Sequence, residues 1–465
     1  MKVVVGIDLG STTTKAVLLD EHGEIVGRGI TNSRSNYAAA SAVARDEALT
    51  STRFSLLSRQ LDSVSGDLGL DARGTLEALN HAFRLELYLE ELGALQDRVN
   101  VLCASLPANE HKAPLTEASR EILKDMRVHA PDLFGPGSQR KSDFFRDIAG
   151  AQFIAGAERA AVDQRVAFER LVGLFDRAIL DIETRVPERE FSILLPRAVD
   201  IVRPGDGGSD PLRQALMTAA LAAAGETIEE VAFVGTGYGR QTLPFPKECV
   251  RSEILCHGRG AHRVFPGTRT VLDIGGQDTK AIQVDNHGVV TSFQMNDRCA
   301  AGCGRYLGYI ADELNLGLHE LGPLALRAQK IVRVNSTCTV FAGAELRERL
   351  ALGQRREDIL AGLHKAILLR AMSLLARSGG IDNEFTFTGG VCKNPMATKL
   401  LQELVIENYG NGIQLNAHAD SIYMGALGAA MFGLDDVNAG RGGMLPTFAI
   451  KKGYLADDAR APCAG

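Results

Sequence analysis

The stretch that decides the fold is Asp8-Leu9-Gly10-Ser11-Thr12-Thr13-Thr14-Lys15, and its pattern returns 265 positions later as Asp273-Ile274-Gly275-Gly276-Gln277-Asp278-Thr279-Lys280. Each copy separates two apolar runs, so each is expected to be the tip of a strand–turn–strand hairpin. A glycine and small hydroxyl residues at a strand end let backbone N–H groups surround an anion. The aspartate that opens each copy can hold a hydrated magnesium ion.

Two facing copies would bind a nucleotide polyphosphate from both sides. The alternative is that each copy is only a hairpin with a polar tip. The repetition argues against that alternative, because Asp, Gly, Thr and Lys recur at the same offsets in both copies.

The bulk composition is that of an ordinary globular protein. A chain of 465 residues is expected to form two or three domains. Hydrophobic content of 45% and a net charge of −6 give no support for nucleic acid or a membrane as the main partner. No apolar run is expected to span a membrane, and the N-terminus leads into a strand rather than a signal peptide, so a cytoplasmic location is predicted. The eight cysteines would then be metal ligands or core thiols.

Five segments are expected along the chain. Residues 1–35 carry the first phosphate hairpin of a first lobe, and residues 201–265 complete that lobe. Between them, residues 36–200 read as a mostly helical insertion, because charged residues alternate with Leu, Ala and Phe at helical spacing. Residues 266–420 form a second lobe, and residues 421–465 form a C-terminal helix and tail. The insertion is either a solvated helical cover or a docking surface for partner subunits.

A third candidate nucleotide element is the stretch Phe385-Thr386-Phe387-Thr388-Gly389-Gly390-Val391-Cys392-Lys393-Asn394. It reads as a strand ending in two glycines, where a missing side chain lets a base or ribose approach the backbone. The alternative is an ordinary strand-to-helix turn. Its position after the second hairpin favours the nucleotide interpretation.

Two cysteines, Cys299 and Cys338, each follow helix-capping residues and precede a helical pattern. The positive end of a helix dipole stabilises a thiolate by about 0.3–1 kcal/mol, and iron or zinc needs thiolates. Two cysteines are half of the set for an iron–sulfur cubane, so a second chain would supply the others. Two structural thiols remain the alternative, since the spacing is not a CxxC signature. Cys303, one turn after Cys299, is a nearby thiol or an alternative ligand.

The other cysteines lack this helix-capping context and are expected to be structural: Cys103, Cys249, Cys256, Cys392 and Cys463. The pair Cys256-His257 suggests a metal site, but neither residue has convincing partner ligands near it in the sequence.

With these residues identified, the chain resembles a known superfamily. Asp8 to Lys15, Asp273 to Lys280 and Thr388-Gly389-Gly390-Val391 match the two phosphate motifs and the adenosine motif of acetate kinase, sugar kinases, Hsp70 and actin. Four further stretches are similar to the ATPases that activate 2-hydroxyacyl-CoA dehydratases and to their relatives in benzoyl-CoA reductase: Gly235-Thr236-Gly237-Tyr238-Gly239-Arg240, Ser252-Glu253-Ile254, Asn296-Asp297-Arg298-Cys299-Ala300-Ala301-Gly302 and Cys338-Thr339-Val340-Phe341-Ala342. The resemblance implies an α/β fold of the actin-like ATPase type, in which a ribonuclease H-like unit is duplicated to give two lobes. The first lobe would carry a large helical insertion.

The long insertion resembles the larger ATP-binding subunit of ATP-dependent benzoyl-CoA reductase more than the compact homodimeric activators. That resemblance implies two paired ATPase subunits sharing one [4Fe–4S] cluster, ferredoxin as electron donor, and further subunits that reduce an aromatic acyl-CoA ring. Two positions depart from the family pattern. Cys303 stands where the family usually has Thr or a similar small residue, and Gly343-Ala344 stands where activators more often have Glu-Ser.

Carried onto this sequence, the resemblance makes Cys299 and Cys338 the cluster ligands. Asp8 and Asp273 would hold Mg²⁺ and orient the attacking water, with Gln277 or Asp278 as helpers. The residues assigned to the phosphates of ATP are small ones: Gly10, Ser11, Thr12, Thr13, Gly275 and Gly276. Those assigned to the adenosine side are Gly389, Gly390 and Lys393. Lys15 and Lys280 either neutralise phosphate charge or are solvated residues that begin the return strands.

The function expected first is the ATP-hydrolysing electron-activation subunit of a benzoyl-CoA reductase. Phosphoryl transfer to water needs mainly positioning and charge neutralisation. Nucleotide-dependent rotation of the lobes would change the surroundings of the cluster and so its reduction potential. Three alternatives remain: a 2-hydroxyacyl-CoA dehydratase activator, a small-molecule kinase of the same fold with structural cysteines, and a non-catalytic nucleotide sensor or scaffold.

Overall fold

The computed structural model describes residues 1–33, 37–68, 71–108, 111–135, 137–138, 144–162, 166–183, 191–204, 210–241, 246–296, 302–314, 316–334 and 339–441. These residues form two compact units. The two-sheet unit contains Lys2–Ala48 and residues 229–441, and the helical unit contains Leu49–Ile228. Both predicted phosphate hairpins lie in the two-sheet unit.

The two-sheet unit contains two sheets built to one plan. The strands of the first sheet are β1 (Lys2–Leu9), β2 (Thr13–Asp20), β3 (Ile25–Asn32) and β4 (Glu229–Thr236), in the order β3-β2-β1-β4. The strands of the second are β5 (Thr270–Ile274), β6 (Thr279–Val284), β7 (Val290–Asn296), β8 (Phe385–Thr388) and β9 (Leu415–Ala417), in the order β7-β6-β5-β8-β9. In each sheet three strands form an antiparallel meander, and the fourth pairs in parallel with the first.

The duplication extends beyond the hairpin tips. In each meander an aspartate accepts two backbone hydrogen bonds in the turn after the second strand. Asp20 Oδ1 accepts from the N–H groups of His22 and Glu24, and Asp285 Oδ1 accepts from those of His287 and Val289, all at 2.8–2.9 Å. Such turns fix where the third strand begins. The predicted duplicated α/β fold is therefore confirmed in its strand order and in its turns.

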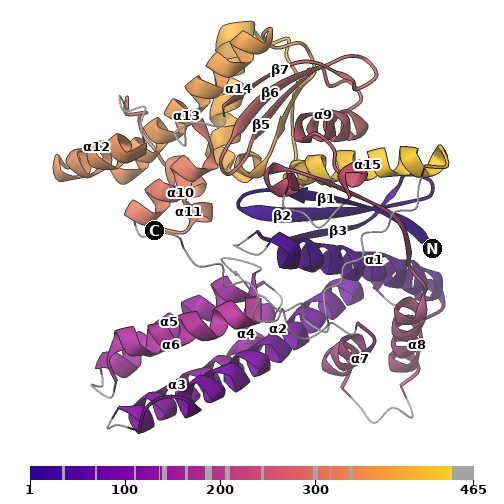
Figure 1. Cartoon of the computed structure of the whole chain (residues 1–465), viewed down its shortest axis with the longest axis vertical. Helices are drawn as coiled ribbons and strands as arrows, with labels where there is room; N and C mark the ends of the chain where they lie inside the picture. Colours follow the sequence, from indigo (N-terminus) through magenta and orange to yellow (C-terminus); the bar gives the residue numbers. More distant parts are fainter. Residues whose placement is uncertain are drawn as a thin grey trace. The chain divides into compact units, whose positions relative to one another are not determined.

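Helices cover both sheets of this unit. The last helix, α15 (Met424–Asn438), packs on β1, and α9 (Glu253–Val264) packs against the other side of α15 (Figure 1). Among the helices that share a core with the second sheet, α13 (Arg356–Ser378) and α14 (Pro395–Tyr409) bury the most apolar side chains. The remaining elements of this unit are α10 (Gly304–Glu313), α11 (Leu318–Ala325), α12 (Thr339–Ala351), η1 (Tyr238–Gln241), η2 (Lys247–Cys249), η4 (Gly390–Lys393) and η5 (Ala419–Tyr423).

Contrary to expectation, one described helix is long and apolar enough to cross a membrane. That helix is α13, and 67% of its most apolar window is buried. Its side chains Leu360, Leu363 and Leu375 share one hydrophobic core with Phe385 and Phe387 of β8. This packing explains its composition, because a helix that contacts the protein on most of its circumference is apolar nearly all round.

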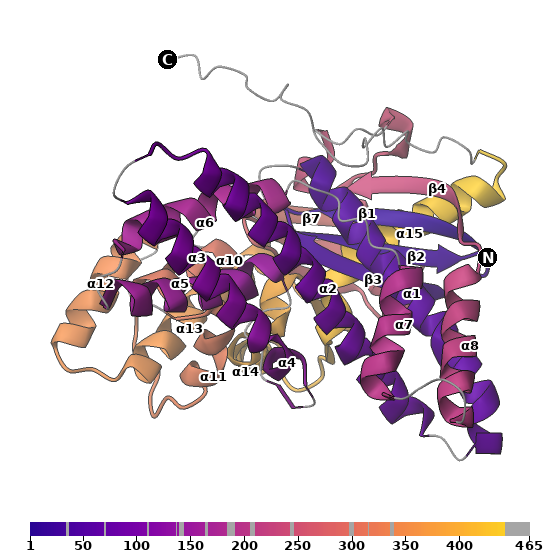
Figure 2. The same ribbon diagram turned by 90° about the horizontal axis from the view of Figure 1, so that it is seen from below.

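The helical unit is organised around one long helix, α2 (Ala72–Ala104). Its N-terminal half shares a core with α1 (Tyr37–Leu68), in which Phe54 contacts Phe83 and Phe191 edge-on with ring centroids 5.3 and 5.5 Å apart. Its C-terminal half packs in a second core around Phe153 and Phe175. Figure 2 shows α3 beside α2 at one end of this helix and α7 beside it at the other, with α8 next to α7.

The predicted helical insertion is confirmed, since the described residues of 37–202 form helices and no strand. The other helices of this unit are α3 (Lys112–Val128), α4 (Ala130–Phe134), α5 (Phe145–Val162), α6 (Phe168–Glu183), α7 (Phe191–Val202) and α8 (Pro211–Gly225).

Candidate functional site

The two predicted phosphate turns face each other. A side-chain carbon placed on Gly276 in the second turn would collide with Thr12 Oγ1 in the first, and it would come within 3.6 Å of Ser11 Oγ. Glycine at position 276 is what allows this approach of the second turn to the first. The sequence expectation of two hairpin tips on either side of one site therefore agrees with the geometry.

Each turn carries an aspartate and a lysine that are direct cross-strand partners. Asp8 is opposite Lys15, and Asp273 is opposite Lys280. Directly opposed residues of an antiparallel pair project on the same face, so the charged groups meet. The Lys15 Nζ lies 3.5 Å from Asp8 Oδ2, and the Lys280 Nζ lies 3.3 Å from Asp273 Oδ2. The lysine side chains are only 12% and 1% exposed, so neither is the solvated surface residue that one alternative proposed.

Lys280 is held by three carboxylates. Besides Asp273, its ammonium group lies 2.8 Å from Glu253 Oε1 and 2.9 Å from Asp278 Oδ1. Burial disfavours the charged lysine, but the three acids outweigh it and raise the pKa of Lys280 well above its usual range. Burial also raises the pKa of Asp278. The lysine therefore stays protonated and ties the second turn to α9.

Asp273 remains ionised although it is almost fully buried. Burial opposes its charge, but His257, Lys280 and the Thr388 hydroxyl together lower the pKa of Asp273 to about 2. The Thr388 Oγ1 donates a hydrogen bond to Asp273 Oδ1 at 3.0 Å. The His257 Nδ1 lies 3.4 Å from the same oxygen.

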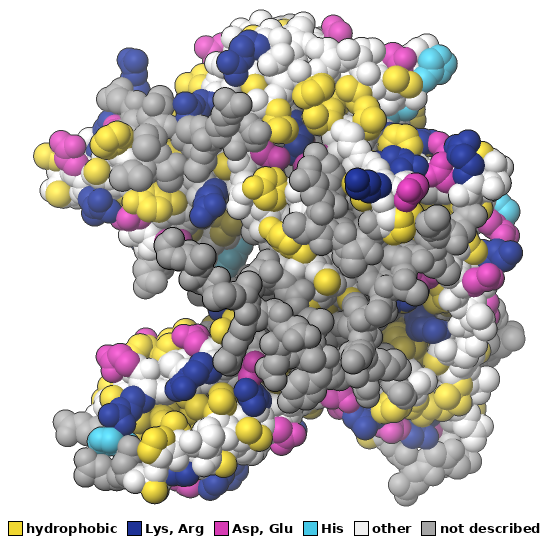
Figure 3. All heavy atoms as spheres, viewed as in Figure 1, with side chains coloured by type: hydrophobic (Ala, Val, Ile, Leu, Met, Phe, Trp, Pro, Cys, Tyr) yellow, Lys and Arg dark blue, Asp and Glu magenta, His cyan; other side chains and the backbone are white. Residues whose placement is uncertain are grey.

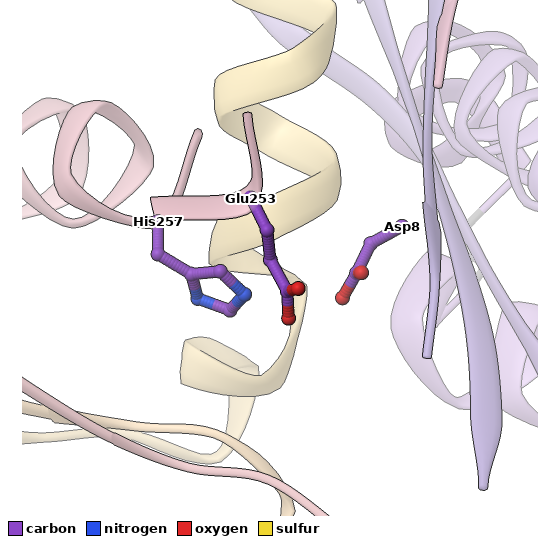
Figure 4. Close-up of side chains that lie close together, drawn as sticks. All are labelled: Asp8, Glu253 and His257. Atoms are coloured by element: carbon purple, nitrogen blue, oxygen red, sulfur yellow. The ribbon is translucent and has the colours of Figure 1, made fainter. Parts of the chain in front are cut away.

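Two residues of α9 complete the site, and the sequence analysis did not place them there. Glu253 and His257 point from one helix face toward Asp8 on β1 (Figure 4). From the sequence, His257 was expected to lack convincing partner ligands near it, and the fold brings one donor atom each of Asp8 and Glu253 within 4.8 Å of its imidazole. Residues four apart on a helix share a face, and this spacing of Glu253 and His257 is the signal that could have found the pair. Cys256, which precedes His257, is buried in the core as predicted, and burial raises the pKa of its thiol to about 12.

A glycine at the start of α15 brings Asp8 and His257 together. A side-chain carbon at Gly425 would lie 2.8 Å from His257 Nε2 and 3.0 Å from Asp8 Oδ2. Both groups therefore border the small space that Gly425 leaves empty. Any larger residue would push the imidazole and the carboxylate apart.

The predicted adenosine motif lies directly beyond the second turn. Its strand β8 ends at Thr388, and Gly389 follows with φ 86° against the carbonyl of Ile274. Gly390 is exposed, and a side-chain carbon there would meet no atom within 4 Å. Lys393, at the end of η4, is also exposed.

The first sheet has a matching feature, which the sequence analysis did not recognise as part of the repeat. Strand β4 ends at Thr236, and Gly237 follows with φ 95°. A side-chain carbon there would lie 2.6 Å from Asp8 Oδ1.

A buried histidine supports the end of the adenosine motif. Asn394 Oδ1 caps α14 by accepting hydrogen bonds from the N–H groups of Met396 and Ala397. The Asn394 amide nitrogen lies 3.0 Å from His364 Nε2, while the His364 Nδ1 lies 2.7 Å from the Leu360 carbonyl. Burial lowers the pKa of His364 to about 4, so the ring is neutral and Nε2 can accept the amide hydrogen bond.

The second phosphate turn is hydrogen-bonded to the start of α10. The N–H of Gly304 donates to the Gly275 carbonyl at 2.8 Å, and the N–H of Arg305 donates to the Gly276 carbonyl at 2.7 Å. The Thr279 hydroxyl also donates to the carbonyl of Gly302. Because these contacts use the main chain of the turn itself, a movement of the turn is transmitted to the first turn of α10.

The two predicted cluster ligands, Cys299 and Cys338, lie outside the described residues. Cys303 is described: it is buried and occupies the N-cap position of α10. At the second departure from the family pattern, a side-chain carbon on Gly343 would lie 2.7 Å from the ring of Tyr309. The small residue there lets α12 pack closely on α10.

Comparison with known proteins assigns the chain to a family. The family described as the BadF/BadG/BcrA/BcrD ATPase family matches residues 5–433. The chain belongs to this ATPase family. The resemblance stated from the sequence motifs is thereby confirmed, and membership supports ATP as the nucleotide.

The relatives include dehydratase activators and a benzoyl-CoA reductase subunit. The (R)-2-hydroxyglutaryl-CoA dehydratase activating ATPase of Acidaminococcus fermentans is 39% identical over 236 residues, which are 50% of this chain and 87% of that protein. The 2-hydroxyisocaproyl-CoA dehydratase activator of Clostridioides difficile is 38% identical over 216 residues, 45% of this chain and 76% of the relative. A benzoyl-CoA reductase subunit of Thauera aromatica is 33% identical over 210 residues, 45% of this chain and 74% of the relative.

The fold has a counterpart among solved structures. The crystal structure of the Acidaminococcus fermentans (R)-2-hydroxyglutaryl-CoA dehydratase component A superimposes with a TM-score of 0.51 at 22% sequence identity. The match covers 94% of this chain and 100% of that one. It confirms the predicted fold class.

Proposed function

We propose that this chain is an ATP-hydrolysing activator of a 2-hydroxyacyl-CoA dehydratase. The observation that carries the nucleotide part is the pair of facing turns, each with a cross-strand aspartate and lysine. The activating ATPases are 38% and 39% identical to this chain, against 33% for the benzoyl-CoA reductase subunit. These relatives favour the activator, which the sequence analysis kept as an alternative, over the reductase subunit that it ranked first.

In this proposal the triphosphate binds between the two turns. Backbone N–H groups of the turn residues would hold its oxygens, with Ser11 and Thr12 on one side and Gly276 on the other. The adenosine would lie at Gly390, where the surface is open. Asp8 and Asp273, from the two lobes, would orient the attacking water, with Gln277 or Asp278 as helpers.

The donor set fits a divalent cation with the nucleotide. Asp8 Oδ1 is buried and has no hydrogen-bond partner among the described residues, and the surrounding groups are mostly carboxylates. Bound Mg²⁺ would neutralise phosphate charge during hydrolysis. Asp8 and Asp273 are the residues that we propose for it.

The link from ATP to electron transfer would run through α10. We propose that Cys299 and Cys338 each supply a thiolate to a [4Fe–4S] cluster shared with a second ATPase chain. Such a cluster carries single electrons at low potential. The hydrogen bonds from Gly304 and Arg305 to the second turn support this link, because they join the segment after Cys299 to the nucleotide site.

The surface after Cys338 supports a partner contact. Helix α12 begins at Thr339, and its exposed side chains include Phe341, which is 67% exposed. Leu352, just beyond its end, is 71% exposed. Exposed aromatic side chains such as Phe341 are enriched at contacts between subunits, and charged side chains lie beside the apolar ones on this helix (Figure 3). The partners that we propose are a second ATPase chain, ferredoxin and the dehydratase, all in the cytoplasm.

Anaerobic purification tests the proposal. We expect iron and sulfide in equal amounts, ATP hydrolysis without a phosphorylated product, and ATP-dependent activation of a 2-hydroxyacyl-CoA dehydratase. A phosphorylated small molecule would identify a kinase instead. The helical insertion favours one second candidate, a benzoyl-CoA reductase subunit. Co-purification with a shorter ATPase chain and ATP-dependent ring reduction would establish that candidate and overturn the activator.

A further inference from the structure

The site contains a set of metal-ligating atoms that goes beyond the two phosphate turns. Asp8, Glu253 and His257 each offer one donor atom, and these atoms all lie within 4.8 Å of one another. In Figure 4 the carboxylate of Glu253 lies between the imidazole of His257 and the carboxylate of Asp8. Asp8 is 3% exposed and His257 is 4% exposed, so two of the three donors are withdrawn from water.

One buried atom of this group, Asp8 Oδ1, has no hydrogen-bond partner within the described part of the chain. A buried polar atom without a partner costs about 1–3 kcal/mol. The Asp8 carboxylate is turned into the group (Figure 4), where a cation would satisfy it.

The fixed charges of the site point the same way. Among the described residues, four carboxylates surround two ammonium groups and one imidazole: Asp8, Glu253, Asp273 and Asp278 around Lys15, Lys280 and His257. An excess of negative charge in a buried site opposes both folding and the entry of a triphosphate. One divalent cation would balance this excess.

The imidazole of His257 is oriented as in metal-binding histidines. Its Nδ1 lies 3.4 Å from Asp273 Oδ1, while its Nε2 borders the space at Gly425 together with Asp8 Oδ2. A ligating histidine usually directs its other ring nitrogen at a carboxylate, which fixes the tautomer and the ring plane. Asp273 occupies that position here, and Nε2 faces the other ligands.

We propose that Asp8, Glu253 and His257 bind one divalent transition-metal ion of the Mn²⁺ class, and that they do so before any nucleotide is present. This inference rests on the proposed function, because Asp8 belongs to the first phosphate turn. Mg²⁺ takes oxygen ligands and retains several waters, whereas an imidazole ligand favours first-row transition metals. The ion would meet the incoming triphosphate as a resident positive charge.

The test uses the untagged full chain, stripped of metal with a chelator, kept anaerobic and free of nucleotide. Mn²⁺ is the probe, because its paramagnetic resonance reports both the free ion and the ligands of the bound ion. We expect one bound Mn²⁺ per chain and a ¹⁴N coupling from a single imidazole. Mg²⁺ should compete only at concentrations at least about tenfold higher. The absence of bound Mn²⁺ at about 1 mM free ion would overturn the proposal.

Variants locate the ion. His257→Ala should remove the ¹⁴N coupling and weaken Mn²⁺ binding at least about tenfold, and Glu253→Gln should weaken binding while the coupling persists. The matched control is His262→Ala on the same helix, which should keep both signals. His257→Gln, closer in size, repeats the test if His257→Ala does not fold. A ¹⁴N coupling that survives in the His257 variants would place the ion elsewhere and overturn the proposal.

The result of the Mn²⁺ test can be told apart from the result of the test of the proposed function. A chain that activates a dehydratase with Mg²⁺ and ATP, yet binds no Mn²⁺ without nucleotide, overturns this inference alone. A chain that binds Mn²⁺ as described, yet hydrolyses no ATP, overturns the proposed function alone.

Discussion

The backbone N–H of Arg305 donates a hydrogen bond to the carbonyl of Gly276 at 2.7 Å, so the first turn of α10 is attached directly to the second phosphate turn. No side chain takes part in this contact. Removal of the Arg305 side chain would therefore leave the bond itself in place. The neighbouring Thr279 hydroxyl, which donates to the Gly302 carbonyl, is the part of the connection that mutation can remove.

The first prediction is that Thr279→Val loosens the start of α10. Loss of the donor leaves the buried Gly302 carbonyl unpaired, at a cost of about 1–3 kcal/mol. The first turn of α10 should then open more often, so amide hydrogen exchange at Gly304 and Arg305 should accelerate at least about fivefold. The control is Thr291→Val, where the lost hydroxyl lies on the exposed strand β7 and donates to the Gln283 carbonyl. Equal protection of α10 in both variants would show that the hydroxyl does not hold the helix.

The second prediction separates the two lysines of the repeat. Lys280→Met leaves three carboxylates without their shared cation, so we expect a loss of at least about 3 kcal/mol in the free energy of unfolding. Lys15→Met removes one partner at 3.5 Å from a more exposed position, and about 1 kcal/mol is expected. Urea unfolding at neutral pH measures both. Similar losses of unfolding free energy in the two variants would contradict the expected difference between Lys280 and Lys15.

The third prediction concerns acid stability. The pKa of His364 is about 4 in the folded chain, below its usual 6.5, so the unfolded chain binds more protons between these values. Stability is therefore lost as pH falls, by about 2 kcal/mol from this residue between pH 7 and pH 5. Urea unfolding of His364→Gln should lack this part of the pH dependence. His129→Gln, which removes an exposed histidine, should retain it.

The fourth prediction distinguishes an adenosine site from a structural turn. Gly390 borders open space, so Gly390→Ala should leave the melting temperature nearly unchanged while it weakens ATP binding at least about tenfold. Gly389→Ala should destabilise the fold, because Gly389 has φ 86° and lies against the Ile274 carbonyl. Gly412→Ala, at another open position, is the control for calorimetric ATP binding. Unchanged affinity in Gly390→Ala would leave the motif as an ordinary turn.

The repeat was predictable from sequence because it is local. A strand, a polar turn and a return strand lie within about 25 residues, so hydrophobic alternation and turn residues specify them without distant contacts. The pairing of Asp8 with Lys15 follows from that hairpin alone. The helical character of the insertion was predictable for the same reason, because helical periodicity is visible in a short window.

The spacing of Glu253 and His257 on one helix face was visible in the sequence, but the residues that face His257 from other elements were not. Asp8 and Gly425 lie far from His257 in sequence, and they meet it only after α9 and β1 have packed on α15. Hydrophobic patterns show that a helix is buried but not which residues face it. The matching of Gly237 to Gly389 was hidden for a related reason, because the strands that end there are separated from their hairpins by long and unequal segments.

The packing of α15 has a consequence for how the protein is made. Val17 and Leu19 of β2 lie in one core with Met424, Ala426, Leu427 and Ala430 of this helix. More than 400 residues must therefore leave the ribosome before this face of the first sheet can be covered. This hairpin is synthesised long before the helix that covers it, and until then its apolar strands are exposed to other nascent chains.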